Sequence, residues 1–289
     1  MKQLYNNFGI NHCPLCKNTD IFKVGNIDYF QPVCYSTEPV SFLLTPELWR
    51  CKRCKSAFVE NIVPESESIL LYQNGKSAER FANGYSDEPK TRSLTKTLIS
   101  LLNKGTKILD VGCNTGDVLD FAKNRGCKTF GVEYSLDSLN ILNKNGHIVY
   151  PNLQEVDESF DVITAFDLIE HLYNLPDFIE TCLNFLAPNG HIILLTGNIN
   201  CIWAKITKSN WWYLRYPEHI IFPSKEYFEN HSRLKLVSWI PTYADRAYDR
   251  PKHLVAMSTL KRVLLRDYSA LPALTPDHGL FILKHRKYS

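Results

Sequence analysis

Two pairs of cysteines have the spacing of a metal site. Each pair reads Cys-x-x-Cys, with Cys13 and Cys16 in the first pair and Cys51 and Cys54 in the second. A tight turn of this kind presents two thiolates, and two such turns complete the tetrahedral set that Zn²⁺ prefers. Because four thiolates leave no position for water, we expect a structural zinc site. The alternative is two turns that carry free thiols.

A second candidate site follows an apolar run at residues 106–112. In the turn DVGCNTGD (residues 110–117), Gly112 and Gly116 bracket a tight connection, where a missing Cβ lets a ligand approach the backbone. The spacing G-x-N-x-G differs from the G-x-G-x-x-G of dinucleotide sites. Glu133, at the end of the next apolar run, can accept hydrogen bonds from both ribose hydroxyls of a nucleoside. Together these segments predict a nucleoside site.

Two of the nine histidines lie where a proton acceptor is expected. His171 follows the fourth predicted strand, and His219 ends the segment WWYLRYPEH, which also contains Tyr216 and Glu218. Imidazole exchanges protons near neutral pH, which suits it to general base catalysis. Glu218 is placed to orient a nearby imidazole. For His171, a capping or packing role at a helix start is the alternative.

Aromatic and basic side chains gather around the same segment. Trp211 and Trp212 lie near Lys205, Lys208 and Arg215. They predict either a stacking wall with phosphate contacts, as a nucleotide-linked sugar requires, or a hydrophobic lid with solvated lysines.

Alternating strands and helices must position these residues. Strands are predicted at 106–112, 128–135, 147–151, 159–167, 191–198, 234–241 and 279–287, and helices at 117–126, 135–146 and 175–190. Continuous Val, Ile and Leu runs separated by amphipathic helices are typical of a parallel sheet covered on both faces. Ligands of such sheets bind beyond the carboxyl ends of the strands.

Three parts of the chain are predicted: a zinc-binding lobe at 1–65, a helical cover and linker at 66–104, and the main α/β domain at 105–289. A lobe of this size is marginally stable without its metal. In the cover, Tyr72 and Tyr85 are expected either to close on the ligand of the main domain or to pack between lobe and sheet.

The composition excludes some classes of protein. The 289 residues include 33 basic and 30 acidic ones, a net charge of +3, which lacks the strong basic excess typical of nucleic-acid binding. No apolar stretch is long enough to span a bilayer, and the N-terminus lacks an apolar leader. We therefore expect a cytoplasmic protein with a small-molecule partner, no membrane partner and an unlikely role in nucleic-acid binding. The oligomeric state stays open.

Four motifs, in order, resemble those of class I S-adenosylmethionine-dependent methyltransferases: ILDVGCNTGDVLDFAKNRG, GVEYS, FDVITAFDLIEHLYN and LAPNGHIILLTGN. The resemblance covers residues 70–289 and implies an α/β, Rossmann-like seven-stranded methyltransferase sheet, here with a small N-terminal zinc-ribbon lobe. Asn114 stands where the family usually has a third glycine, which requires a left-handed backbone. The residues implied to bind S-adenosylmethionine are Asp110, Gly112, Cys113, Asn114, Gly116, Glu133, Tyr134, Phe166, Asp167 and Tyr85.

The cysteine pairs and residues 216–219 also resemble the zinc-bearing sugar C-methyltransferases, whose catalytic loop reads Tyr-His-Glu-His. Here the loop is Tyr216-Pro217-Glu218-His219, so the basic His is kept and the earlier His is replaced by proline. This departure favours oxygen methylation over carbon methylation. The residues implied to be catalytic are His219, His171, Tyr216 and Glu218.

The expected function is methyl transfer from S-adenosylmethionine to a hydroxyl of a saccharide, sugar nucleotide or related metabolite. Two alternatives remain open. One is an RNA methyltransferase whose zinc lobe binds nucleic acid. The other is a non-catalytic zinc-ribbon binding protein.

Overall fold

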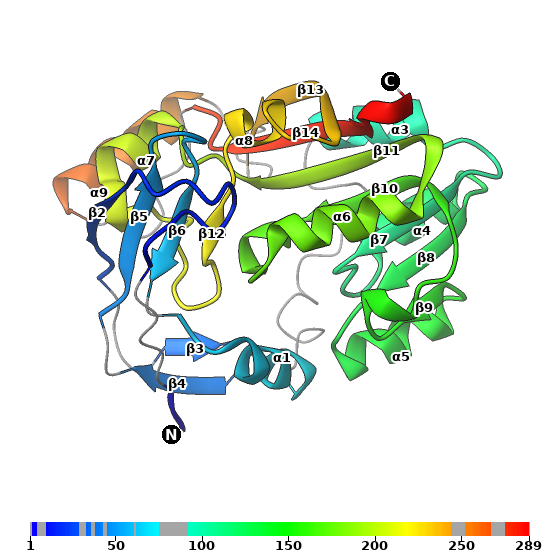
Figure 1. Ribbon diagram of the computed structural model, residues 1–289, viewed down its shortest axis with the longest axis horizontal. Coiled ribbons are helices and arrows are strands. Elements are labelled where there is room, and N and C mark those ends of the chain that lie inside the picture. The colour runs from blue at the N-terminus through cyan, green and yellow to red at the C-terminus, as the bar shows by residue number, and fades with distance from the viewer. Residues whose placement is uncertain are drawn as a thin grey trace.

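The computed structural model describes residues 2–4, 10–28, 33–35, 38–42, 45–60, 62–74, 92–243, 252–266 and 275–288. These residues form a seven-stranded sheet, a four-stranded sheet and a three-stranded sheet. Figure 1 shows the seven-stranded sheet across the upper and right part of the molecule and the two smaller sheets at the left. Tyr85 lies outside the described residues.

The large sheet has the strand order β13-β14-β11-β10-β7-β8-β9. Strands β7 to β11 pair in parallel, and β14 is antiparallel to both β11 and β13. Their bounds are β7 (Lys107–Val111), β8 (Lys128–Val132), β9 (Ile148–Tyr150), β10 (Phe160–Phe166), β11 (Leu186–Gly197), β13 (Leu234–Thr242) and β14 (His278–His285). All seven predicted strands are present, which confirms the α/β, Rossmann-like fold.

Successive residues of the central strands enter different hydrophobic clusters. In β7, Ile108 packs in the cluster that contains α3 (Arg92–Leu101), whereas Leu109 packs in the cluster that contains α6 (Leu175–Phe185). Helices α4 (Asp117–Lys123) and α5 (Leu136–Lys144) follow β7 and β8. Since both faces of the sheet are buried, its strands are continuous apolar runs.

Two smaller sheets make up the N-terminal lobe. One is β1 (Lys2–Leu4), β4 (Glu38–Phe42) and β3 (Val33–Tyr35). The other has the order β12-β6-β5-β2 and consists of β2 (Ile21–Asn26), β5 (Glu47–Cys51), β6 (Ala57–Glu60) and β12 (Ile221–Phe222). The strand β12 comes from the middle of the predicted main domain, so the lobe is completed by a distant segment. The predicted boundaries at residues 65 and 104 stay a prediction.

Residue 220 connects the lobe to the large sheet. The N–H of Val59 in β6 donates to the carbonyl of Ile220 over 2.8 Å, and the N–H of Ile220 donates to the carbonyl of Glu170 over 2.8 Å. Glu170 lies in the 3₁₀ helix η3 (Ile169–His171), which follows β10. The lobe therefore supports the segment that ends at His219 through backbone hydrogen bonds.

The remaining helices are α1 (Glu65–Asn74), η2 (Leu153–Glu155), α7 (Ile202–Thr207), η4 (Lys208–Asn210), α8 (Lys225–Glu229), α9 (Lys252–Leu264) and η6 (Arg286–Tyr288). Among the helices that the structure describes, none combines the length and the apolar character needed to cross a bilayer.

Candidate functional site

The four paired cysteines converge at the end of β5, whose last residue is Cys51. The Sγ atoms of Cys13 and Cys54 are 3.7 Å apart, those of Cys16 and Cys51 are 3.6 Å apart, and all four lie within 4.8 Å of one another. Zn–S bonds of about 2.3 Å in a tetrahedron separate sulfur atoms by about 3.8 Å. The cysteine cluster therefore has the size of a tetrahedral zinc site.

The two cysteine turns close in the same way. The N–H of Lys17 donates to the carbonyl of Cys13 over 2.9 Å, and the N–H of Lys55 donates to that of Cys51 over 3.1 Å. Both lysines have a left-handed backbone, with φ of 58° and 59°. The hydrogen bond with Cys13 lowers the pKa of Cys54 to about 5, and the same contact raises the pKa of Cys13. Two matched turns thus bring four sulfur atoms together.

Three residues of the turn after β7 have a left-handed backbone. Their φ angles are 72° at Gly112, 46° at Asn114 and 99° at Gly116. The left-handed conformation predicted for Asn114 is therefore confirmed. A Cβ at Gly112 would lie 2.9 Å from Cδ1 of Leu168, which follows β10. The turn consequently lies against the end of β10, with no room for a side chain at this glycine.

Glu133 joins the turn after β7 to the end of β8. Its Oε2 accepts the N–H of Asn114 and its Oε1 accepts the N–H of Ser135, each over 2.9 Å. Burial raises the pKa of Glu133, and these backbone hydrogen bonds oppose the shift. Each carboxylate oxygen has a second lone pair, so the pair of oxygens suits a ribose with two hydroxyls.

Asp110 lies beneath the turn, and only 4% of its surface is exposed. The hydroxyl of Thr164 in β10 donates to Oδ1 of Asp110 over 2.6 Å. Burial raises the pKa of Asp110 to about 7, although this hydrogen bond opposes the shift. Near neutral pH the group is therefore poised between its charged and neutral forms.

The other residues predicted to contact the cofactor differ in their surroundings. Phe166 and Asp167 lie at the end of β10, and Asp167 has a left-handed backbone with φ of 48°. Tyr134 is 40% exposed next to Glu133. Cys113 directs its side chain into the core, because a Cβ at Gly131 would lie 2.6 Å from its Sγ. Only the backbone of Cys113 is therefore available to a ligand.

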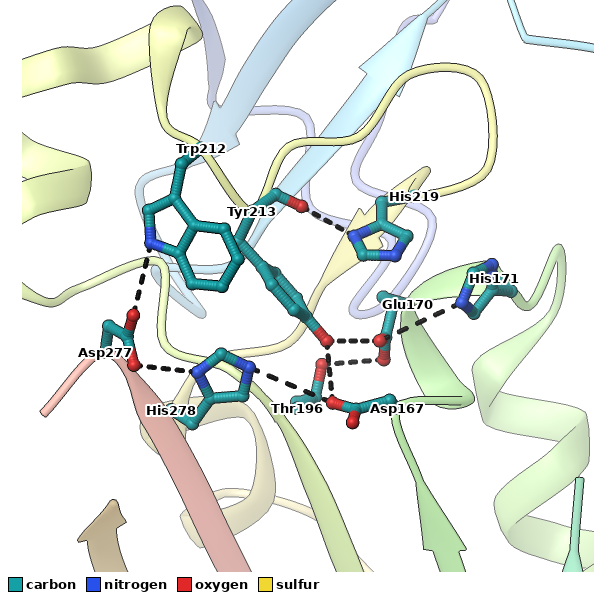
Figure 2. A network of polar contacts seen from close by, with 9 residues as sticks. All are labelled: Asp167, Glu170, His171, Thr196, Trp212, Tyr213, His219, Asp277 and His278. Atoms are coloured by element: carbon teal, nitrogen blue, oxygen red, sulfur yellow. Dashed lines mark hydrogen bonds and ion pairs between the residues drawn. The ribbon is translucent and has the colours of Figure 1, made fainter. Parts of the chain in front are cut away.

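A polar network lies at the same edge of the sheet (Figure 2). The Tyr213 hydroxyl is 3.0 Å from Oδ1 of Asp167 and also contacts Oε1 of Glu170, while Thr196 donates to Oε2 of Glu170 over 2.8 Å. Burial raises the pKa of Glu170, which is 0% exposed. Because the Tyr213 hydroxyl has one proton to donate, both of its contacts are satisfied when it donates to Asp167 and accepts from a protonated Glu170.

His219 is held in one tautomer. Its Nδ1 lies 2.6 Å from the backbone carbonyl of Tyr213, and a carbonyl only accepts, so Nδ1 carries the hydrogen. Burial lowers the pKa of His219 well below its ordinary value, with the nearby His171 adding to the shift. The imidazole is thus neutral at physiological pH and has its lone pair on Nε2. This is the protonation state that a general base requires.

The structure brings His171 and His219 together. Their ring centroids are 4.7 Å apart, and Nδ1 of His171 lies 2.8 Å from the hydroxyl of Tyr72 in α1. Nε2 of His171 lies 3.9 Å from Oε1 of Glu170. Ligand atoms of Glu170, His171 and His219 all lie within 4.8 Å of one another, a spacing that a divalent cation also accepts. The segment from α1 thereby contributes to the same cluster.

Tyr216 and Glu218 are also buried in this region, at 8% and 7% exposure. The N–H groups of Glu218 and His219 both donate to the carbonyl of Arg215, over 2.9 and 3.0 Å, which forms the turn that aims His219. The four residues predicted to be catalytic therefore lie in two short segments, 169–171 and 216–219, joined at residue 220.

The stacking wall predicted at Trp211 and Trp212 is not formed by both residues. Trp211 is 2% exposed and packs against Phe222, so it belongs to the core. Trp212 donates from Nε1 to Asp277 over 3.1 Å, and the Arg215 guanidinium lies 5.7 Å from its ring centroid.

Sequence patterns did not reveal Tyr213, Thr196, Asp277 or His278. Nδ1 of His278 donates to Oδ1 of Asp277 over 2.9 Å, and Nε2 of His278 lies 3.8 Å from Asp167. It starts β14, which is antiparallel, opposite Gly197 at the end of β11. An Asp-His pair just before the last strand was the available signal, because the start of an antiparallel strand meets the ends of its parallel neighbours.

Comparisons with known proteins identify the family of the chain. A family profile described as "Methyltransferase domain" matches residues 84–231, just over half of the chain. Among curated proteins, the ubiquinone biosynthesis O-methyltransferase of Alkalilimnicola ehrlichii is 28% identical over 108 residues, which are 34% of this chain and 44% of that protein. The corresponding protein of Bradyrhizobium diazoefficiens is 26% identical over 127 residues, 40% of this chain and 50% of that protein. The chain thus spans about half the length of these relatives.

Among solved structures, a putative sarcosine dimethylglycine methyltransferase from Galdieria sulphuraria has a TM-score of 0.50 and 14% identity, covering 72% of this chain and 97% of that chain. At this identity the likeness concerns the fold alone.

Proposed function

The chain belongs to the methyltransferase-domain family of S-adenosylmethionine-dependent enzymes, and from this premise we propose that it methylates a hydroxyl of a saccharide, sugar nucleotide or related small metabolite. One observation carries the proposal. His219 is neutral, buried and fixed with its lone pair on Nε2, beside the end of β10. A hydroxyl acceptor must lose a proton on methylation, and a neutral imidazole can accept that proton as a general base. The O-methyltransferase relatives support an oxygen acceptor.

We propose that the edge formed by β7, β8 and β10 binds the cofactor. Glu133 would accept the ribose hydroxyls, and the backbone at Gly112 and Gly116 would lie against the methionine part. The fit is supported by the two oxygens of Glu133, each held by one backbone N–H, and by the left-handed backbone of the turn at Gly112, Asn114 and Gly116. The cofactor supplies an electrophilic methyl group, so the protein has to align the acceptor oxygen and remove its proton.

The proton step falls to His219 in this proposal. Its Nε2 would take the proton of the acceptor hydroxyl, whose oxygen would receive the methyl group that S-adenosylmethionine supplies. The Nδ1–H bond to the carbonyl of Tyr213 stabilises the imidazolium that forms. His171, partly exposed and held by Tyr72, is placed to orient the acceptor hydroxyl, with Tyr216 and Glu218 nearby.

We further propose a structural Zn²⁺ on Cys13, Cys16, Cys51 and Cys54. The sulfur separations support it. The metal would have no direct part in methyl transfer, since four thiolates complete its coordination. It would instead fix β5 and β6, and through Val59 the segment that carries His219.

A panel of acceptors tests the function. Purified protein with S-adenosylmethionine is offered sugar nucleotides, free glycosides, catechols and RNA, and the release of S-adenosylhomocysteine is measured. We expect turnover with a saccharide-containing acceptor, and NMR of the product should show the methyl group on oxygen. Turnover with RNA alone, or methylation on carbon or nitrogen, would contradict the proposal.

The spacing of Glu170, His171 and His219 favours a second way to activate the hydroxyl, through a bound divalent cation. Treatment with a chelator separates the two mechanisms, provided that metal analysis shows zinc retained on the cysteines. If His219 is the base, turnover is unchanged. If turnover is lost and is restored by Mg²⁺ or Mn²⁺, the cluster is a cation site.

A further inference from the structure

Helix α9 presents apolar side chains to solvent. Leu254, Met257, Leu260 and Leu264 are 52%, 67%, 62% and 75% exposed, and Leu265, just after the helix, is 68% exposed. Four of these five line an open hollow together with Lys261. Helices of water-soluble domains normally turn such a stripe towards the core. An exposed apolar patch on one helix is a sign of an interaction surface.

The exposed residues share one side of the helix. At about 100° per residue, these five side chains fall within an arc of about 140° around the helix axis. Thr259, which is 4% exposed, lies on the side that faces the protein. The Leu and Met side chains of α9 are therefore exposed, whereas Thr259 on the opposite side is buried.

Helix α7 adds to the same end of the molecule. Ile202 and Ile206, one turn apart, are 55% and 63% exposed. Figure 1 shows α7 and α9 together at one end of the long axis, opposite α5 and β9. We call the exposed apolar side chains of α9 and its end the α9 face: Leu254, Met257, Leu260, Leu264 and Leu265.

Charge in these segments has a single sign. Neither residues 198–217 nor residues 252–266 contain an Asp or Glu, although acidic residues number 30 in the chain. The same segments contain seven basic residues: Lys205, Lys208, Arg215, Lys252, Lys261, Arg262 and Arg266. Lys261 lines the same hollow as four of the apolar side chains, so a basic side chain accompanies the apolar ones on this helix.

We propose that the α9 face docks on an anionic lipid surface. An amphipathic helix with Leu and Met on one side and Lys and Arg around it lies in the membrane interface, with its apolar side at the acyl boundary and its cations on the headgroup phosphates. A second copy of the chain fits less well, because a two-fold contact brings each positive patch against itself. Nucleic acid offers phosphates but no apolar partner for the leucines.

This docking goes beyond the proposed methyl transfer and does not rest on it. The sequence led us to expect no membrane partner, because no segment is long enough to span a bilayer. A surface contact needs no spanning segment, so the exposure of α9 changes that expectation for the lipid surface alone.

Co-sedimentation with vesicles tests the docking. The full chain is mixed with phosphatidylcholine vesicles, with or without phosphatidylglycerol, at low and high salt. We expect sedimentation with the anionic vesicles only, weakened by salt because the lysine and arginine contacts are screened.

Paired substitutions locate the surface. Leu260→Ser with Leu264→Ser, and separately Lys205→Gln with Lys261→Gln, should each weaken vesicle binding about tenfold or more. Ile148→Ser is the matched control, since Ile148 is 53% exposed on β9 at the other end of the molecule. Circular dichroism and S-adenosylmethionine binding should be unchanged in all of them.

Four results would overturn the proposal. They are no binding of the wild type to anionic vesicles, equal binding to neutral vesicles, equal loss in Ile148→Ser, and dimers that the leucine pair breaks while lipid binding is absent. Each can be obtained whether or not the protein methylates a sugar hydroxyl, because release of S-adenosylhomocysteine is measured separately.

Discussion

Gly116 is constrained by both backbone conformation and space. Its φ is 99°, and an added Cβ would lie 2.7 Å from Cδ2 of Leu142. We expect Gly116→Ala to lower the free energy of unfolding by about 2–4 kcal/mol, from left-handed strain and overpacking together. Gly105→Ala is the matched control, with φ of 90° and no atom within 4 Å of its Cβ. Gly105→Ala should lower the free energy of unfolding only through backbone strain, by about 1–2 kcal/mol. Equal losses in urea unfolding would contradict the crowding at Leu142.

The buried carboxyl of Asp110 makes stability depend on pH. Burial raises its pKa from 3.8 to about 7, so the folded state holds this proton more tightly than the unfolded state. The resulting stabilisation is complete below pH 4 and is lost as the pH rises through 7, a change of about 4 kcal/mol at most. Asp110→Asn should therefore flatten the rise in urea midpoint on going from pH 7 to pH 4, measured without S-adenosylmethionine. An unchanged slope in the variant would show that Asp110 does not titrate in this range.

Glu133 should control cofactor affinity. Glu133→Gln removes the charge and replaces one of the two oxygens that accept backbone N–H groups with a donor. Hydrogen bonds to charged groups contribute about 1.5–3 kcal/mol, so affinity for S-adenosylmethionine should fall roughly tenfold to a hundredfold in calorimetry. Glu229→Gln, on the surface of α8, makes the same change of charge and should bind normally. Wild-type affinity in Glu133→Gln would remove the carboxylate from the cofactor site.

At the scale of elements, the contact between β6 and residues 220–222 links the N-terminal lobe to the candidate site, so loss of the proposed zinc should be felt there. Cys54→Ser should reduce the zinc content and speed hydrogen exchange at residues 220–222, because metal loss loosens β6 and its backbone bonds to this segment. Mass spectrometry measures both effects. Cys34→Ser changes an exposed cysteine and should alter neither. Zinc loss with unchanged exchange would show that the lobe does not support the segment.

The strands of the large sheet were predictable because each is an apolar run buried on both faces. The strand β12 was not, since its two residues form a strand only against β6, more than 160 positions away. The start of β11 was also mispredicted: Leu186 pairs with Phe160, and the strand continues through Ala187–Gly190, where Pro188 and Gly190 indicated a turn. A register shift near Phe160 accommodates these residues. Local signals failed where tertiary pairing determined the outcome.

At the scale of the whole molecule, the sites defined by local spacing were easier to predict than the polar network. The cysteine turns and the turn at Gly112 are contained within a few residues each. The network instead joins Asp167, Thr196, Tyr213 and His278, which lie in four separate segments that meet only at the sheet edge. No spacing pattern in the sequence predicts that these four segments come together.

The fold as a whole fixes the position of His219 relative to the end of β10. The large sheet presents the turn after β7, and the N-terminal lobe holds residue 220, next to His219. Val59 and Glu170 hold Ile220 from two sides, so the imidazole is fixed relative to the end of β10. We therefore expect the proton acceptor and the cofactor site to be separable by mutation.

Paired measurement of turnover and cofactor affinity in His219→Gln tests this central claim most directly. With the acceptor found in the panel, release of S-adenosylhomocysteine should fall about a hundredfold or more, the usual contribution of a general base. The dissociation constant of S-adenosylmethionine should be unchanged, and His191→Gln, at the start of the parallel part of β11, should retain turnover. Wild-type turnover in His219→Gln, or parallel loss of turnover and cofactor affinity, would contradict the account.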